Sequence, residues 1–168
     1  EFNKTVNDFR DFMGKLIVSE EDLEIEEIVV NELKNKEYTI SFSESVTGGM
    51  LASTIINVNG ASDVIKESYV TYSNEVKNKI LNVSFETIDK YDVVSEEVVK
   101  EMVIGLYNKT LSNVCVATSG YASGELSGKV CFAIKVNDRI NTYTHNFRGN
   151  RNLIRLRATR RILYELHL

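Results

Sequence analysis

The sequence of 168 residues contains no proline and no tryptophan, and only two cysteines and two histidines. Without proline, every tight turn has to be built from Gly, Asn, Asp or Ser. Cys115 and Cys131 form no Cys-x-x-Cys pair, and with the two histidines they match no metal-binding spacing, so no metal site is expected. No apolar run is long enough to span a membrane, and no basic start followed by an apolar stretch marks an export signal. These absences predict a reduced, cytoplasmic protein without membrane contact.

The composition is that of a globular protein, and the charged residues are unevenly distributed along the sequence. The chain is 43% hydrophobic and 26% charged, with a net charge of −4. Residues 1–37 hold eleven acidic and five basic side chains, whereas seven of the eight arginines lie between Arg139 and Arg161. This tail predicts either pairing with the acidic front half or binding of phosphate groups. The acidic net charge argues against nucleic acid as a partner, although a nucleic-acid binder would have six arginines to use: Arg148, Arg151, Arg155, Arg157, Arg160 and Arg161.

Hydrophobic periodicity divides the chain into an N-terminal helix, residues 1–20, and one domain, residues 21–168. Apolar residues at helical spacing from Phe2 to Val18 predict an amphipathic helix that packs on the domain or on a second copy, and this apolar side favours a homo-oligomer, a dimer or higher. In the domain, the pattern predicts strands at 39–42, 64–72, 114–118, 129–137 and 140–147. It predicts helices at 19–35, 50–56, 73–81, 85–91, 95–111 and 150–166. The last two strands form a hairpin, so the predicted fold class is α/β: a layered single domain with a mixed sheet of about five strands flanked by helices.

The stretch from Thr39 to Met50 organises the rest of the domain. It consists of a short predicted strand, a polar turn over Ser43–Thr47, two glycines and the start of a helix. Such a turn points unpaired backbone N–H groups and the positive end of a helix dipole at one spot, which suits an anion or a developing oxyanion. From the turn alone, an ordinary capped helix with Ser45 or Thr47 as N-cap is the better explanation. Ligands of such folds bind beyond the carboxyl ends of the strands, so the residues that follow strands should share one pocket: Ser45, Ser119 and Gly120.

Six short segments then carry a family resemblance, in order, between about residue 22 and residue 166. They are 43–49 (SESVTGG, similar to AESCTGG), 60–62 (GAS, similar to PGAS), 70–77 (VTYSNEVK, similar to VxYSNxxK), 94–98 (VSEEV, similar to VSxEV), 117–120 (ATSG, in the place of VTG) and 147–151 (FRGNR, similar to FxGDR). Together they resemble the CinA C-terminal domain family, the nicotinamide mononucleotide deamidases. Any one segment alone would be a weak signal, whereas six in order are specific.

The resemblance implies a nicotinamide-nucleotide amidase, which hydrolyses the carboxamide of nicotinamide mononucleotide to nicotinate mononucleotide and ammonia. Ser45 matches the family's nucleophile, Lys77 the lysine that activates it, and Tyr72 a further catalytic position. A buried lysine loses its proton more readily, and the planar fork of an arginine suits a 5′-phosphate. This chemistry requires no cofactor and no metal, and the implied partner is a small nucleotide. The predicted substrate-binding residues are Thr47, Gly48, Gly49, Ser119, Gly120 and Arg151.

Departures from the family pattern keep a second interpretation open. The family carries a long Gly- and Pro-rich loop after VTG, whereas residues 121–130 here are fewer and contain no proline. Asn150 also replaces the aspartate before Arg151. The alternative is a non-catalytic nucleotide-binding or interaction domain that retains the scaffold. Taken singly, a lysine such as Lys77 on a short helix is more often solvated, and an arginine such as Arg151 more often pairs with an acid.

Overall fold

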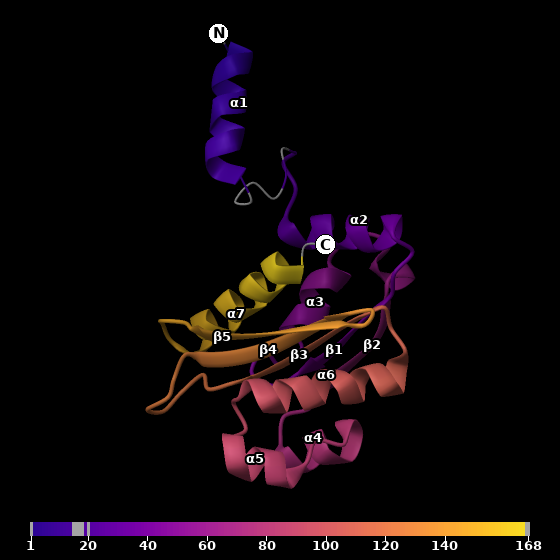
Figure 1. Ribbon diagram of the computed structural model, residues 1–168, viewed down its shortest axis with the longest axis vertical. Helices are drawn as coiled ribbons and strands as arrows, with labels where there is room; N and C mark the ends of the chain where they lie inside the picture. Colours follow the sequence, from indigo (N-terminus) through magenta and orange to yellow (C-terminus); the bar gives the residue numbers. More distant parts are fainter. Residues whose placement is uncertain (1, 15–18, 20, 167–168) are drawn as a thin grey trace.

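Five strands form one sheet in the order β2-β1-β3-β4-β5 in the computed structural model, which describes residues 2–14, 19 and 21–166 (Figure 1). β1 (Ile40–Glu44) lies between β2 (Ile65–Val70) and β3 (Val114–Gly120) and pairs with both in parallel. β4 (Lys129–Val136) and β5 (Arg139–Asn146) continue the sheet as an antiparallel hairpin. The predicted α/β fold with a mixed sheet is therefore confirmed. β1 and β3 are buried almost throughout, as expected of parallel strands that are covered on both faces.

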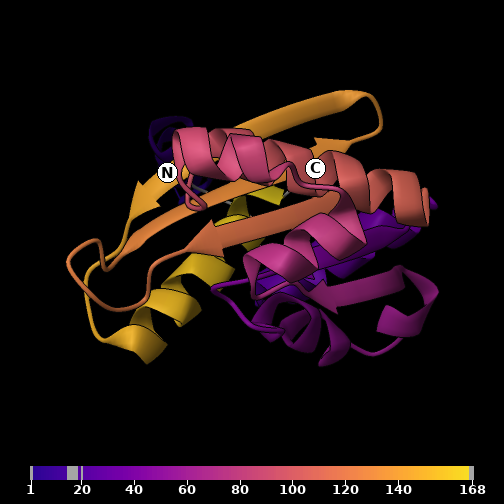
Figure 2. The same ribbon diagram turned by 90° about the horizontal axis from the view of Figure 1, so that it is seen from below.

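Helices cover both faces of this sheet. In chain order they are α1 (Phe2–Met13), α2 (Ile25–Asn35), α3 (Met50–Ile56), the short 3-10 helix η2 (Ala61–Asp63), α4 (Asn74–Leu81), α5 (Phe85–Tyr91), α6 (Glu96–Thr110) and α7 (Arg151–Leu166). Figure 1 shows α2, α3 and α7 on one face and α6 on the other, with α4 and α5 outside α6. From below, α4 lies alongside α6 (Figure 2). Helix α4 begins four residues after the carboxyl end of β2, so it lies near that edge of the sheet.

Two hydrophobic cores follow from the layers. The first packs α2, α3 and α7 on the sheet, with Phe42 and Leu51 among its fully buried side chains. The second packs α6 on the opposite face and includes Met102, Cys115 and Cys131. Both cysteines are buried and free, and burial raises the pKa of each thiol, so they act as small core residues here.

Two predicted helix boundaries differ from the structure. The helix expected from residue 19 begins at Ile25 instead, because Glu24 and Glu27 form a reciprocal capping box at that point. Ser19 accepts a local hydrogen bond from the N–H of Glu21. The N-terminal helix ends at Met13, and residues 15–18, which the prediction included, lie outside the described part of the chain.

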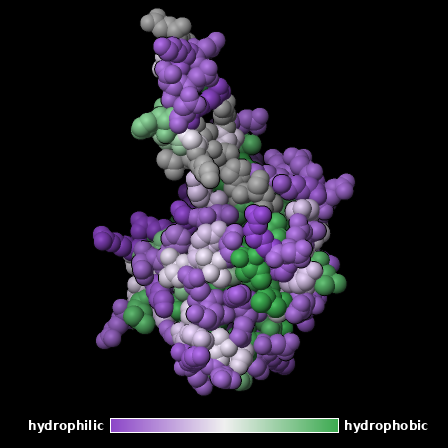
Figure 3. All heavy atoms as spheres, in the orientation of Figure 1, coloured by the Kyte–Doolittle hydropathy of each residue, from purple (hydrophilic) through white to green (hydrophobic). Residues whose placement is uncertain are grey.

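Helix α1 extends away from the sheet (Figure 1). Phe9 is 57% exposed and Phe12 is 84% exposed. Packing of the apolar side of α1 against a second copy remains a prediction. In the space-filling view the surface is mostly hydrophilic, with one strip of hydrophobic residues at the level of the strands (Figure 3). Within the described residues, no helix has both the length and the apolar character needed to cross a bilayer.

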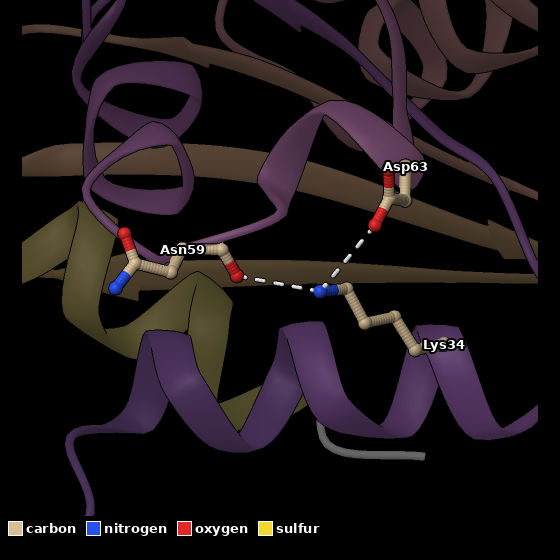
Figure 4. A network of polar contacts seen from close by, with 3 residues as sticks. All are labelled: Lys34, Asn59 and Asp63. Atoms are coloured by element: carbon tan, nitrogen blue, oxygen red, sulfur yellow. Dashed lines mark hydrogen bonds and ion pairs between the residues drawn. The ribbon is translucent and has the colours of Figure 1, made fainter.

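A polar contact ties α2 to the turn that follows α3 (Figure 4). The Nζ atom of Lys34 donates to the backbone oxygen of Asn59 at 3.3 Å and pairs with the carboxylate of Asp63 at 3.6 Å. Gly60 stands between them with φ of 77°, a conformation that L side chains rarely adopt. The turn at 60–62 is therefore a structural element that sets the path from α3 to β2.

Candidate active site

Ser45 is the first residue after β1, at the carboxyl end of the parallel part of the sheet. Its backbone N–H donates to the Oγ1 atom of Thr118 on the neighbouring strand β3, at 3.2 Å. The same Thr118 hydroxyl contacts the hydroxyl of Thr47 at 3.1 Å. Ser45 is only 7% exposed, so its hydroxyl is reached from solvent only through the cavity that it lines.

Lys77 reaches Ser45 from helix α4. Ser73 caps the start of this helix by accepting from the N–H of Val76. Lys77, in the first turn, lies on the buried side of the helix and is 1% exposed. The Nζ atom lies 3.3 Å from the Oγ atom of Ser45. It also donates to the backbone oxygens of Thr71, at 3.0 Å, and of Tyr72, at 3.2 Å. The predicted meeting of residues 45 and 77 therefore occurs, across 32 positions of sequence.

The burial of Lys77 makes its ammonium easier to deprotonate. Burial lowers the pKa of Lys77 from 10.5 to about 8, because the charged ammonium loses its hydration. Within residues 21–166, no carboxylate forms an ion pair with it that would restore the charge. A neutral amine donates its two N–H groups to the two backbone oxygens, which leaves the lone pair for the hydroxyl of Ser45. This arrangement can remove a proton from the serine.

A cavity of about 220 Å³ opens beside the pair and brings together six of the nine predicted site residues. These six are Ser45, Tyr72, Lys77, Ser119, Gly120 and Arg151. At its rim, Arg151 donates to the hydroxyl of Tyr72 at 3.1 Å and to that of Ser123 at 3.4 Å. Tyr72 is 64% exposed, and its contact with Lys77 runs through its backbone oxygen. The phenol of Tyr72 thus belongs to the arginine side of the cavity.

A hydrogen bond of Ser119 joins two loops that form one wall of the cavity. Its hydroxyl donates to the backbone oxygen of Val93 at 2.8 Å, so only its acceptor lone pairs face a ligand. Next to it, the hydroxyl of Tyr121 donates to the carboxylate of Asp92 at 2.6 Å. Burial is the main reason why the pKa of Tyr121 rises to about 12. The sequence pointed to Ser119 and the 121–130 loop, but it did not single out Asp92 and Val93, which come from the loop before α6.

The other three predicted residues, Thr47, Gly48 and Gly49, do not line this cavity. The prediction of an anion site at the start of α3 also differs from the structure, because Glu44 occupies that position. Its buried carboxylate accepts from the N–H groups of Gly49, Leu51 and Ala52, each at 3.0 Å. The acid inside the SESVTGG signature therefore caps the helix, and the positive end of the helix dipole is already satisfied.

Comparison with known proteins shows which family the chain resembles. A family model described as "CinA C-terminal domain" matches residues 22–168. A relative from Finegoldia magna, whose name describes it as competence-damage inducible, is 44% identical over 98% of this chain and 40% of its own. A "CinA-like protein" of Fervidobacterium nodosum is 42% identical over 95% of this chain and 40% of its own. The chain thus spans about 40% of the length of these curated relatives.

Solved structures give the same result. A CinA superfamily protein of Klebsiella pneumoniae superposes with a TM-score of 0.82 at 29% identity, covering 85% of this chain and 93% of its own. A competence/damage inducible protein of Agrobacterium tumefaciens gives 0.81 at 27% identity, with 88% and 96% covered. Sequence and fold therefore agree: the chain belongs to the CinA C-terminal domain family.

Proposed function

We propose that this domain is a nicotinamide-nucleotide amidase that hydrolyses the carboxamide of nicotinamide mononucleotide, with Ser45 as nucleophile and Lys77 as its base. The observation that carries the proposal is the 3.3 Å contact between Lys77 Nζ and Ser45 Oγ, made by a buried amine whose two other contacts are neutral carbonyls. This distance slightly exceeds the range of about 2.6–3.2 Å for a working base, and such contacts often tighten when substrate binds.

In the first half of the reaction, the amide is exchanged for an ester. The Oγ atom of Ser45 attacks the carboxamide carbon while its proton passes to the amine of Lys77. The carbonyl oxygen becomes an oxyanion in the tetrahedral intermediate. The resulting ammonium of Lys77 then protonates the leaving nitrogen, the C–N bond breaks, and ammonia departs from an acyl-serine.

In the second half, water replaces the serine. Lys77, again neutral, takes a proton from the water that attacks the acyl carbon. It returns this proton to the Oγ atom of Ser45 as the ester bond breaks, and the carboxylate product leaves. The sum is one amide and one water converted to one acid and one ammonia, with the enzyme restored.

The rim of the cavity suits the other end of a mononucleotide. A volume of about 220 Å³ is below the roughly 300–1,000 Å³ of common ligand pockets, so it would enclose the carboxamide end of the substrate. Arg151 is exposed, and after its contacts with Tyr72 and Ser123 each terminal nitrogen keeps one further N–H that can bind a phosphate outside the cavity. We therefore assign the phosphate to Arg151 and the reacting amide to Ser45.

The alternative is a nucleotide-binding domain without catalysis. Tyr121, Ala122 and Ser123 of the short 121–130 loop line the cavity, so a change of this loop alters the pocket directly. A nucleic-acid surface has less support, because Arg155 and Arg161 are engaged by partners within the domain. The catalytic proposal is preferred because a ligand-binding site alone has no need of a buried lysine, with a pKa lowered to about 8, in contact with a serine.

Turnover of nicotinamide mononucleotide is the direct test. We expect the protein to release equal amounts of ammonia and nicotinate mononucleotide, and free nicotinamide, which lacks the phosphate for Arg151, to be a much poorer substrate. Both products are measured by chromatography and an ammonia assay. Binding of the mononucleotide without ammonia release would favour the non-catalytic alternative, and equal turnover of nicotinamide would remove the role of Arg151.

The pH dependence should report the protonation of Lys77. Because the base must be neutral, kcat/KM is expected to fall about tenfold per unit below pH 8 and to level off above it. The lowered pKa has a second consequence: the unfolded state holds the proton more tightly, so stability should rise with pH between about 8 and 10.5. A kcat/KM that is flat from pH 6 to 9 would contradict this role of Lys77.

A further inference from the structure

We infer that Arg155 is a positioning residue for the nucleophile, because it fixes the backbone of the turn that follows Ser45. The inference rests on the proposed serine nucleophile. Arg155 does not line the cavity, so it has no contact with a substrate bound there. Its effect on the reaction has to pass through the backbone of Val46 and Thr47.

The contacts of Arg155 are directed at two consecutive peptide groups. Its Nε atom donates to the backbone oxygen of Val46 at 3.1 Å, and its Nη2 atom donates to that of Thr47 at 2.9 Å. The two partners lie more than a hundred positions away in sequence. Helix α7 lies beside the turn, since Ile154 and Ala158, on either side of Arg155 along the helix, belong to the same buried hydrophobic cluster as Val46.

Fixing these two oxygens also fixes the opposite ends of the same peptide groups. In a trans peptide the C=O and N–H bonds point in opposite directions. With the oxygens of Val46 and Thr47 turned to Arg155, the N–H groups of Thr47 and Gly48 point away from it. Within residues 21–166, no acceptor meets either N–H group.

A free peptide group next to Ser45 could rotate in either direction. If one rotated by half a turn, its carbonyl oxygen would face the side on which negative charge develops during attack, and the two partial charges would repel. The guanidinium opposes this rotation because it binds both oxygens at once in its rigid fork, and the N–H of Met50 adds a longer contact, at 3.3 Å, to the oxygen of Thr47. Arg155 therefore holds these two peptide groups with their oxygens toward the guanidinium and their N–H groups away from it.

Gly48 lies against the guanidinium of Arg155. Its φ of +60° is a left-handed conformation, and a Cβ atom there would lie 3.1 Å from the Nη2 atom of Arg155. An alanine would be strained by its backbone and would press on the guanidinium at the same time. Gly48→Ala thus disturbs the hydrogen bond from Nη2 of Arg155 to Thr47 and provides a second variant.

The reactivity of Ser45 toward a fluorophosphonate probe tests the inference without any assumption about the natural substrate. In this reaction the Ser45 oxygen bonds to phosphorus, the P–F bond breaks, fluoride leaves, and the serine proton passes to Lys77. The labelling rate of the wild-type protein is compared with those of Arg155→Gln, Arg155→Lys and Gly48→Ala by intact mass. Arg160→Gln, on the same helix and exposed, is the matched control.

We expect Arg155→Gln and Gly48→Ala to be labelled about 10–100-fold more slowly, and Arg155→Lys to recover part of the rate because an ammonium can still hold one carbonyl. Arg160→Gln should match the wild type. With nicotinamide mononucleotide, kcat should fall in step while KM stays constant. If labelling is unchanged in Arg155→Gln, the inference is wrong. It is also wrong if the loss merely follows a lower melting temperature that Arg155→Lys shares.

The test also separates this inference from the proposed function. Slow labelling of the Arg155 variants by a protein that does not hydrolyse nicotinamide mononucleotide would support the role of Arg155 and remove only the proposed substrate. A wild-type Ser45 that fails to react with the probe would overturn both, since no activated nucleophile would then exist for Arg155 to hold.

Discussion

Ser45→Ala and Lys77→Met are each expected to lower kcat for the mononucleotide by at least about a thousandfold, with KM nearly unchanged. Ser45→Ala removes the atom that forms the acyl intermediate. Lys77→Met keeps the length and the apolar stem of the side chain but removes the amine that lies 3.3 Å from that atom. Because the two groups act as one unit, the double variant should be scarcely slower than either single variant. Steady-state ammonia release, with purified proteins at pH 9, measures all three.

The matched control for the lysine is Lys79→Met, which changes an exposed lysine of the same helix α4 and should retain full activity. Thermal unfolding separates chemistry from folding. Lys77→Met leaves the backbone oxygens of Thr71 and Tyr72 without a donor, yet it also removes a charge that is costly to bury below pH 8. These effects oppose each other, so the melting temperature should change little. A Lys77→Met protein that keeps a tenth of the wild-type kcat would rule out the lysine as the base.

The sequence was sufficient for the parts of this site that depend on the order of elements. The apolar patterns of 39–42 and 114–118 predicted two strands of one sheet. The structure pairs them in parallel, and parallel strands end at the same edge of a sheet. Ser45, Ser119 and Gly120 follow those strands and do line one cavity. Lys77 joins them because β2 pairs directly with β1, so the helix that follows β2 starts at the same edge. The signature segments named the residues, and the topology accounts for their meeting.

The sequence was not sufficient where a side chain has more than one possible partner. Glu44 had been grouped with the hydroxyls of the polar turn, but its alternation within β1 turns it toward α3, where three N–H groups bind it. The expected anion site was therefore already filled by the chain itself. Arg155 belonged to an arginine-rich tail in which any member could bind phosphate. Its partners come from the opposite part of the chain, and no local pattern indicates such a contact.

Gly105→Ala is expected to destabilise the domain and to impair the site from a distance. Gly105 lies in α6 where this helix crosses the last turn of α4, next to Leu81. A Cβ atom at this position would fall on the carbonyl oxygen of Leu81 and lie only 2.7 Å from its carbonyl carbon and 2.9 Å from its Cα atom. These are backbone atoms, which cannot turn aside as the end of a flexible side chain can. The two helices therefore have to separate.

The sign of this effect follows from two opposing magnitudes. Replacing a glycine by alanine inside a helix favours folding by about 1 kcal/mol. Overpacking against backbone costs about 1–3 kcal/mol and occasionally more, and contacts below 3 Å belong at the upper end of that range. The net loss should be about 2 kcal/mol, which lowers the melting temperature of a domain of this size by roughly 4–8 °C.

The displacement also acts on the site, because α4 carries Lys77 one turn before Leu81. Moving α4 outward draws the amine away from Ser45, and a shift of a few tenths of an ångström to 1 Å should lower kcat by about tenfold or more. Asn108→Ala, an exposed position of the same helix, is the control and should change neither quantity appreciably. A Gly105→Ala protein that melts above the wild type would mean that helix propensity outweighs the contact. In that case the close approach of α4 and α6 is not what holds Lys77 on Ser45.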